Sequence, residues 1–171
     1  NQTYTPVEII FLDDASTDDS VDVAEKLLKN STVESSIVTN KTNKGVFKQW
    51  QAGVKKAKGD YVWIAEADDS ASPYFLQELV GRIWQEKSVI AYCQSKVIDE
   101  NGVLIRAGNY HHTDDLSLTR WKTDYSEIGL REVLDYVSYR NSIPNASACL
   151  INKKELLKCL NVSNDFKYCG D

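Results

Sequence analysis

Short apolar runs alternate with amphipathic stretches along the chain. The apolar runs are dense in Val, Ile and Phe, and most lead through a polar turn into apolar residues that recur every three or four positions. This alternation is typical of an α/β domain with a mostly parallel central sheet flanked by helices. The predicted strands span residues 7–12, 37–38, 61–65, 89–97, 103–105 and 146–151. The predicted helices run from the polar turn at 13–19 to about residue 29, and over 47–57, 73–84, 130–139 and 153–160.

Apolar stripes on the first three helices identify much of the expected core. The residues expected to face inward are Val23, Ala24, Leu27 and Leu28, then Phe47, Trp50, Val54 and Ala57, then Leu76, Leu79, Val80, Ile83 and Trp84. Trp63, in the third predicted strand, is expected in the core as well. The stretch 107–125 is polar and has no clear period, and it is predicted to be a loop.

The composition is that of an ordinary folded domain. Hydrophobic residues make up 42% and charged residues 26% of the 171 residues, which argues against disorder. The net charge of -5 and the lack of a basic stripe in the sequence argue against a nucleic acid bound mainly through its phosphates. A phosphorylated small molecule remains compatible, because a metal ion can supply positive charge locally.

The four cysteines are Cys93, Cys149, Cys159 and Cys169, and no two of them have C-x-x-C spacing. A zinc site is therefore not expected, and we interpret the cysteines as reduced thiols. No apolar run approaches the ~20 residues that span a bilayer, and no signal peptide is visible. These features predict a cytoplasmic protein. The chain starts without Met and reads as a piece of a longer protein.

Two pairs of aspartates each follow a predicted strand: Asp13-Asp14 the first, Asp68-Asp69 the third. Ligands of open parallel sheets bind beyond the carboxyl ends of the strands, and neighbouring strands lie only ~5 Å apart. Carboxylates that lie so near each other repel one another. An Mg²⁺ or Mn²⁺ ion held together with substrate phosphates relieves the repulsion. Helix capping and turn formation explain each pair taken alone. They do not explain two pairs at one sheet edge, so the pattern favours a site for a metal and a diphosphate.

Three segments, in order along the chain, resemble family 2 glycosyltransferases with the GT-A fold. They are EIIFLDDASTD at 8–18, NKG at 43–45 followed by QAG at 51–53, and GDYVWIAEADD at 59–69. Each piece alone is weak, but the set is specific, and the resemblance extends from residue 1 to about 100. It implies a GT-A fold whose first strand is absent from this chain. It also implies a single catalytic domain, 1–171, truncated at both ends, with a nucleotide-sugar donor half (1–100) and an acceptor half (101–171).

The resemblance implies a reaction as well as a fold. A sugar would pass from a nucleoside-diphosphate sugar to an acceptor hydroxyl, with inversion and with the help of Mg²⁺ or Mn²⁺. The sugar would be a hexose or an N-acetylhexosamine, the acceptor a glycan or a lipid-linked molecule, and the setting cell-surface polysaccharide synthesis. Regions outside this chain would provide any peripheral attachment to the inner face of the cell membrane.

Positions that match the family's motifs give the expected donor site. Asp14 is expected to contact the nucleotide base, with Asp13 supporting its turn. Asp69 is expected to bind the metal and Asp68 to lie near the ribose or the metal, while the role of Glu66 stays open. The other residues expected to bind the nucleotide sugar are Ser16, Asn43 and Gly45; the 43–45 loop precedes a helix N-terminus, which suits phosphate.

The acceptor side is expected in the second half of the chain. Asp171, in the motif YCGD at 168–171, has the form and the position of the family's catalytic base, which takes the proton of the acceptor hydroxyl. The alternative is a terminal residue without a role. Asn145 and Ser147 are expected to line the acceptor side, the alternative being a turn before a strand. Trp121 is the one tryptophan expected to offer its ring to a sugar.

Two other functions stay open. The domain could bind a nucleotide sugar without turnover, as a module of a larger synthase. A sugar nucleotidyltransferase would use a similar sheet and metal, although the turn at 13–16 argues against the Gly-rich triphosphate loop that it needs. The lack of a G-x-G-x-x-G after any predicted strand argues against a dinucleotide-dependent oxidoreductase.

Overall fold

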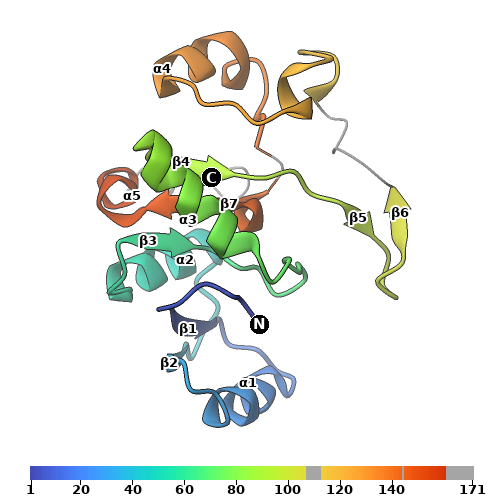
Figure 1. Ribbon diagram of the computed structural model, residues 1–171. Helices are drawn as coiled ribbons and strands as arrows, with labels where there is room; N and C mark the ends of the chain where they lie inside the picture. Colours follow the sequence, from blue (N-terminus) through green and yellow to red (C-terminus); the bar gives the residue numbers. More distant parts are fainter. Residues whose placement is uncertain (107–112, 144, 161–171) are drawn as a thin grey trace.

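The computed structural model describes residues 1–106, 113–143 and 145–160 (Figure 1). The α-helices are α1 (Ser20–Lys29), α2 (Val46–Lys56), α3 (Phe75–Glu86), α4 (Gly129–Glu132) and α5 (Lys153–Cys159). The strands are β1 (Glu8–Asp13), β2 (Glu34–Thr39), β3 (Tyr61–Trp63), β4 (Ile90–Tyr92), β5 (Val97–Ile98), β6 (Leu104–Arg106) and β7 (Cys149–Asn152). Two 3-10 turns, η2 (Arg120–Lys122) and η4 (Ala146–Ala148), and a π-helical turn, η3 (Val133–Val137), complete the description.

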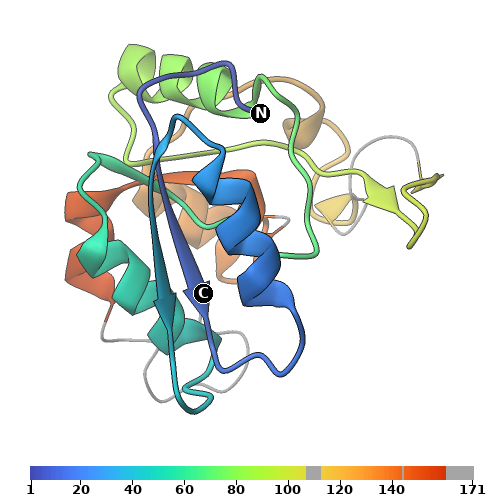
Figure 2. The same ribbon diagram turned by 90° about the horizontal axis from the view of Figure 1, so that it is seen from below.

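The strands form two neighbouring sheets and one hairpin. β1 and β2 pair in parallel, with Glu8 opposite Glu34 and Asp13 opposite Thr39. β7 lies between β3 and β4 and runs antiparallel to both. Figure 1 shows β2, β1, β3, β7 and β4 one above another, with the β5–β6 hairpin projecting from them. Figure 2 shows α1 on one side of β1 and β2 and α2 on the other, so helices flank the strands on both faces.

The antiparallel β7 is the departure from a mostly parallel sheet. Its register pairs Trp63 with Leu150 and Tyr92 with Cys149. The chain enters β7 at the edge where β3 and β4 end, so β7 runs back against both of them. As a result, the residues that lead into β7 lie beside the end of β3.

One face of α3 forms the centre of the core. The buried cluster consists of Phe75, Leu76, Leu79, Val80 and Ile83 of α3 with Leu150 of β7. The prediction that Trp84 faces inward was wrong: it is 65% exposed, because at about 100° per residue it lies at the edge of the stripe. Val23 and Leu27 were also expected inside and are exposed, and Ala24 is the buried residue of α1.

Other differences from the predicted elements come from long-range pairing. The predicted strand 89–97 is divided into β4 and β5, because only its first part pairs with β7. The predicted helix 130–139 begins as α4 and continues as η3. Trp50 and Trp63 are partly rather than fully buried. Among the described helices, none combines the length and the apolarity needed to cross a membrane.

Gly53 brings α2 close to β1. A Cβ at this position would lie 2.7 Å from Cδ1 of Leu12, closer than two carbon atoms approach without repulsion. The glycine of the QAG segment therefore lets the helix pack against the strand that leads to the first acidic pair. At Gly81 of α3, by contrast, a Cβ would meet nothing within 4 Å.

We predict that alanine is accepted differently at these two helical glycines. Gly81→Ala should raise the free energy of unfolding by about 0.5–1 kcal/mol, because alanine loses less backbone entropy in a helix. Gly53→Ala should be less stable than Gly81→Ala by about 1–3 kcal/mol, because Leu12 must shift to admit the methyl group. Denaturant unfolding of both variants measures the difference. Equal stabilisation by the two substitutions would contradict the close approach of α2 to β1.

Candidate functional site

β1 and β3, which lead to the two acidic groups, start side by side. Oε1 of Glu8, at the start of β1, accepts hydrogen bonds from the backbone N–H groups of Lys58 and Gly59, just before β3, at 2.5 and 2.9 Å. The neighbouring positions of β1 and β3 in Figure 1 agree with these contacts. Each strand then ends in a turn that carries acidic residues.

Asp13 builds the turn after β1. It is buried, and its two carboxylate oxygens accept the backbone N–H of Ser16, each at 3.3 Å. Its backbone carbonyl accepts the N–H of Asn40 at 3.0 Å, which ties the end of β1 to the end of β2. Ala15 takes the left-handed conformation (φ 66°), which is uncommon for a residue with a side chain. Asp13 thus holds a tight turn, and the side chain of Ser16 is exposed.

Asp14 joins this turn to the 43–45 loop. Its carboxylate accepts the side-chain amide of Asn40 at 2.8 Å, the N–H of Lys44 at 2.9 Å and the N–H of Gly45 at 2.8 Å. Burial raises the pKa of Asp14, but the hydrogen bonds from Lys44, Asn40 and Gly45 outweigh it and hold this pKa below its ordinary value of 3.8. The turn after β1 and the 43–45 loop were both predicted to bind the nucleotide. These contacts make them one structural unit.

Gly45 gives this unit its backbone geometry. Its φ of 90° lies in the region that favours glycine, and in this conformation its N–H reaches Asp14. Gly45 directly precedes α2, so the loop presents the N-terminal end of that helix. The side chain of Asn43 is exposed beside it.

The acidic turn after β3 contains three carboxylates rather than two. Ligand oxygens of Glu66, Asp68 and Asp69 lie within 4.8 Å of one another. The N–H of Asp69 donates to the carbonyl of Glu66 at 3.2 Å, which closes the turn. Glu66 is partly buried and the two aspartates are exposed, so the turn can reach a ligand from solvent. Mg²⁺ in a protein site is usually held by one or two carboxylates together with phosphate oxygens, and carboxylate oxygen also suits Mn²⁺. Glu66 therefore joins Asp68 and Asp69 as a residue that fits such an ion.

Ser147 lies against the acidic turn. Its hydroxyl accepts the N–H of Glu66 at 3.0 Å and its carbonyl accepts the indole N–H of Trp63 at 2.8 Å. The side-chain amide of Asn145 donates to the hydroxyl of Ser95 at 3.2 Å, on the segment after β4. Both residues stand where β7 begins. No local pattern in the sequence indicates these contacts, because they depend on the antiparallel register of β7.

The interpretation of Trp121 as a sugar platform was wrong. Its side chain is buried, and its indole N–H donates to the hydroxyl of Tyr92 at 3.0 Å. Its ring packs edge-on against Tyr136 with the ring centres 5.2 Å apart. η2 turns Trp121 inward, so the ring is a packing element of the second half of the chain.

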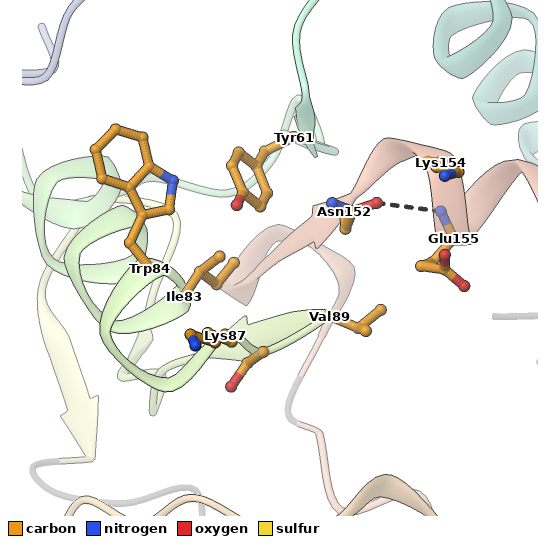
Figure 3. Close-up of a pocket in the computed structure, with 9 residues that line it drawn as sticks. Tyr61, Ile83, Trp84, Lys87, Val89, Asn152, Lys154 and Glu155 are labelled. Carbon is orange, nitrogen blue, oxygen red and sulfur yellow. Dashed lines mark hydrogen bonds between the residues drawn. The ribbon is translucent and has the colours of Figure 1, made fainter.

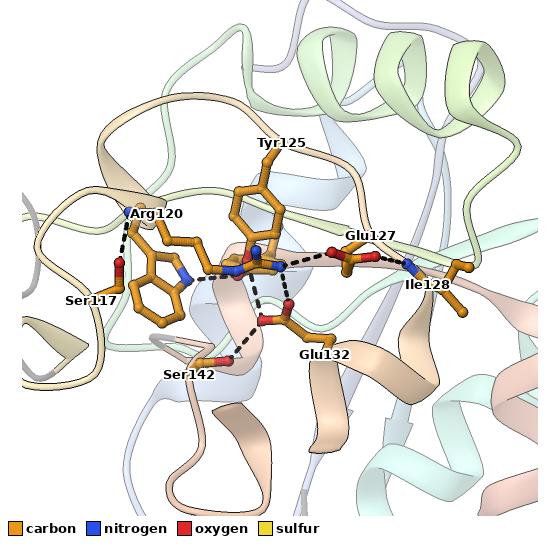
Figure 4. A network of polar contacts seen from close by, with 9 residues as sticks. Ser117, Arg120, Tyr125, Glu127, Ile128, Glu132 and Ser142 are labelled. Atoms are coloured by element: carbon orange, nitrogen blue, oxygen red, sulfur yellow. Dashed lines mark hydrogen bonds and ion pairs between the residues drawn. The ribbon is translucent and has the colours of Figure 1, made fainter. Parts of the chain in front are cut away.

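Arg120, next to Trp121, is the centre of a polar network (Figure 4). Its guanidinium forms an ion pair with Glu132 and lies over the ring of Tyr125, 4.1 Å from the ring centre. Tyr125 also hydrogen-bonds to Tyr92 of β4. Burial, then the contact with Tyr92, raises the pKa of Tyr125 well above its ordinary value of 10.0, so its hydroxyl stays protonated. The network fastens the segment 120–132 to the sheet.

A pocket of about 460 Å³ lies at one end of the strands of the second sheet, and the acidic turn lies at the other end (Figure 3). Tyr61 at the start of β3 and Asn152 at the end of β7 line it, with Trp84 and Lys87 of the α3 end. The acidic turn follows the other end of β3. The pocket therefore does not contain the predicted site.

Some predicted residues lie outside the described parts of the chain. Asp171, the expected base, is one of them, and Cys169 is another. Of the cysteines that the structure describes, Cys93 is partly buried, Cys149 is buried and Cys159 is exposed, and none of the three is in a disulfide.

The fold is similar to that of S. aureus TarS. Two crystal structures of TarS residues 1–349, one of them in complex with UDP, superpose with TM-scores of 0.69 and 0.70 at 20% identity. The similarity covers 99% of this chain and 45% of the crystallised TarS chain. The chain is therefore an α/β protein of the GT-A type. A family model, glycosyl transferase family 2, matches residues 1–160, and the chain belongs to that family.

Curated relatives carry glycosyltransferase names. WfaP of Escherichia coli, named as a UDP-Glc:alpha-D-GlcNAc-diphosphoundecaprenol beta-1,3-glucosyltransferase, is 26% identical over 95% of this chain and 61% of its own length. Glycosyltransferase GlyG of Streptococcus pneumoniae is 31% identical over 67% of this chain and 33% of its own. An uncharacterized glycosyltransferase of Haemophilus influenzae is 30% identical over 71% and 36%. The chain spans between 26% and 61% of the length of such relatives.

We predict that Asp14→Asn destabilises the protein by about 1–3 kcal/mol at neutral pH, because an amide cannot accept from all three donors. The pKa of Asp14 is lowered in the folded state, so its contribution is complete above 3.8 and is lost as the pH falls below that value. The stability difference between wild type and Asp14→Asn should therefore shrink in acid. Urea unfolding at several pH values tests this.

Asp60→Asn is the matched control for this prediction. Asp60 is an exposed aspartate just before β3, and its substitution should change the free energy of unfolding by less than about 0.5 kcal/mol. If the difference in the free energy of unfolding between wild type and Asp14→Asn stays constant as the pH falls, the role given to the Asp14 hydrogen bonds is contradicted.

Proposed function

We propose that the protein containing this chain transfers a sugar from a nucleoside-diphosphate sugar to an acceptor hydroxyl, with inversion and with help from a divalent cation. The observation that carries the proposal is the group of carboxylates on Glu66, Asp68 and Asp69, within 4.8 Å of one another after β3 of a family 2 glycosyltransferase chain. Membership of that family favours sugar transfer over nucleotidyl transfer.

The nucleotide is proposed to lie over the unit formed by Asp14 and the 43–45 loop. The N–H groups of Lys44 and Gly45 are already taken by Asp14, so this loop offers a preformed shape to the donor. The N-terminal end of α2 directly after Gly45 favours negative charge. Asp13, Ser16 and Asn43 surround the same turn and loop.

Asp69 is proposed as the principal metal ligand, with Asp68 toward the metal or the ribose and Glu66 as a further oxygen donor. Mg²⁺ or Mn²⁺ held there would neutralise the charge that develops on the departing diphosphate. The three carboxylates orient and attract the ion, and the exposure of the two aspartates leaves room for phosphate oxygens.

The acceptor oxygen would form a bond to the anomeric carbon as the bond between that carbon and the diphosphate oxygen breaks. Asp171, outside the described residues, is proposed as the base that receives the proton of the acceptor hydroxyl. The acceptor is proposed to be a glycan or a lipid-linked molecule in cell-surface polysaccharide synthesis. The name of WfaP, which specifies a diphosphoundecaprenol-linked acceptor, supports this class. We place the reaction in the cytoplasm, including the inner face of the cell membrane.

The donor is proposed to be a uridine, guanosine or thymidine diphosphate sugar carrying a hexose or an N-acetylhexosamine. The TarS structure in complex with UDP and the UDP-Glc in the name of WfaP support uridine. A direct comparison of the three nucleotides decides which of them this protein binds.

A thermal-shift panel of UDP, GDP and TDP, with and without Mn²⁺, tests the proposal on the full-length protein. One or two nucleotides should raise Tm by a few degrees, and only when Mn²⁺ is present, because the ligand binds the folded state through the ion. Asp69→Asn should abolish the shift.

Asp60→Asn serves as the control here too, because Asp60 precedes the same strand at its other end. That variant should keep the full shift. Equal shifts with and without Mn²⁺, or a full shift in Asp69→Asn, would count against the metal site.

A further inference from the structure

The β3–β7 ladder stops just before the acidic turn. Its last pair is Trp63 with Leu150. Beyond it, Ser147 takes over: its carbonyl accepts the indole N–H of Trp63 at 2.8 Å and its hydroxyl accepts the backbone N–H of Glu66 at 3.0 Å. Ser147 therefore contacts both the last residue of β3 and the first residue of the acidic turn.

Ser147 itself is firmly held. It is 8% exposed and belongs to η4, in which the N–H of Ala148 donates to the carbonyl of Asn145 at 3.3 Å. The carbonyl of Ala148 accepts the N–H of Cys93, after β4, at 3.1 Å. Leu150, three residues on, is part of the central core. The hydroxyl is thus fixed relative to β3, β4 and α3.

The backbone of Glu66 is tied to the rest of the acidic turn. The carbonyl of Glu66 accepts the N–H of Asp69, so a contact that fixes the backbone of Glu66 also fixes the start of the turn that carries both aspartates. Three carboxylates within 4.8 Å repel one another when no cation is bound, and the repulsion tends to spread them. An anchored backbone limits that spreading and keeps the oxygens within reach of one ion.

We propose that Ser147 is a positioning residue for the cation: its hydroxyl holds the Glu66 backbone so that the carboxylates of Glu66, Asp68 and Asp69 converge. This inference rests on the proposed function. It differs from the expectation that Ser147 lines the acceptor side, since the group that it contacts is the metal-binding turn. The contact also links the second half of the chain to the donor site.

Mn²⁺ binding to the full-length protein without nucleotide, measured by calorimetry, tests the proposal. Ser147→Ala removes the hydroxyl that accepts the hydrogen bond from the Glu66 N–H. It should weaken Mn²⁺ binding about 10-fold or more, the usual effect of losing a contact that orients metal ligands. Ser147→Thr keeps the hydroxyl and should restore binding. In activity assays the Mn²⁺ concentration for half-maximal rate should rise in Ser147→Ala, while kcat at saturating Mn²⁺ changes little.

Ser142→Ala is the matched control. Ser142 is also buried, but its hydroxyl hydrogen-bonds to Glu132 in the network of Figure 4. This variant loses a buried serine hydroxyl without touching the acidic turn, and it should bind Mn²⁺ as wild type does. A similar loss in Ser142→Ala and Ser147→Ala would mean a general loss of stability and would overturn the proposal.

Amide hydrogen exchange at Glu66, followed by NMR, is independent of metal and of activity. The amide should be protected in wild type and exchange faster in Ser147→Ala. A wild-type Glu66 amide that exchanges as fast as exposed turn amides would overturn the proposal even if a variant failed to fold, as would unchanged Mn²⁺ affinity in a folded Ser147→Ala. If wild type binds no Mn²⁺ but protects Glu66, the proposed function fails while the structural contact stands.

Discussion

The pairing of β7 between β3 and β4 is the interaction on which the rest of the second sheet depends. Leu150 brings β7 into the apolar cluster of α3, and its register fixes which residues meet Trp63 and Tyr92. Because β7 runs antiparallel, its first residues lie at the carboxyl end of β3. A segment from late in the chain is thereby placed against the turn that carries Glu66, Asp68 and Asp69.

The two acidic groups are held in different ways. Asp14 is compensated within the protein, since Asn40, Lys44 and Gly45 supply hydrogen-bond donors to its carboxylate. The turn after β3 brings carboxylates together and anchors mainly its backbone, through Ser147. The first arrangement gives a rigid unit whose negative charge already has hydrogen-bond donors around it. The second leaves negative charge to be neutralised, which is the condition for attracting a cation.

Local patterns predicted the elements well where one stretch of chain decides the outcome. The order of strands and helices up to α3 was predicted, and so was the apolar stripe of Leu76, Leu79 and Ile83, because helical periodicity needs no partner to be visible. Trp84 shows the limit of that reasoning. Whether a residue at the edge of a stripe is buried depends on what packs beside the helix, and the sequence does not state that.

The sequence by itself determined that this is a family 2 glycosyltransferase chain, with aspartates directly after two strands and a glycine-containing loop between them, since those motifs are contiguous and their chemistry is in the residue types. Tertiary structure alone decided that Asp14 binds the 43–45 loop, that Trp121 is buried and that Ser147 meets Glu66. Each of these contacts joins residues distant in the chain. Their partners are fixed by strand direction and register, which depend on the packing of the whole domain rather than on any one segment.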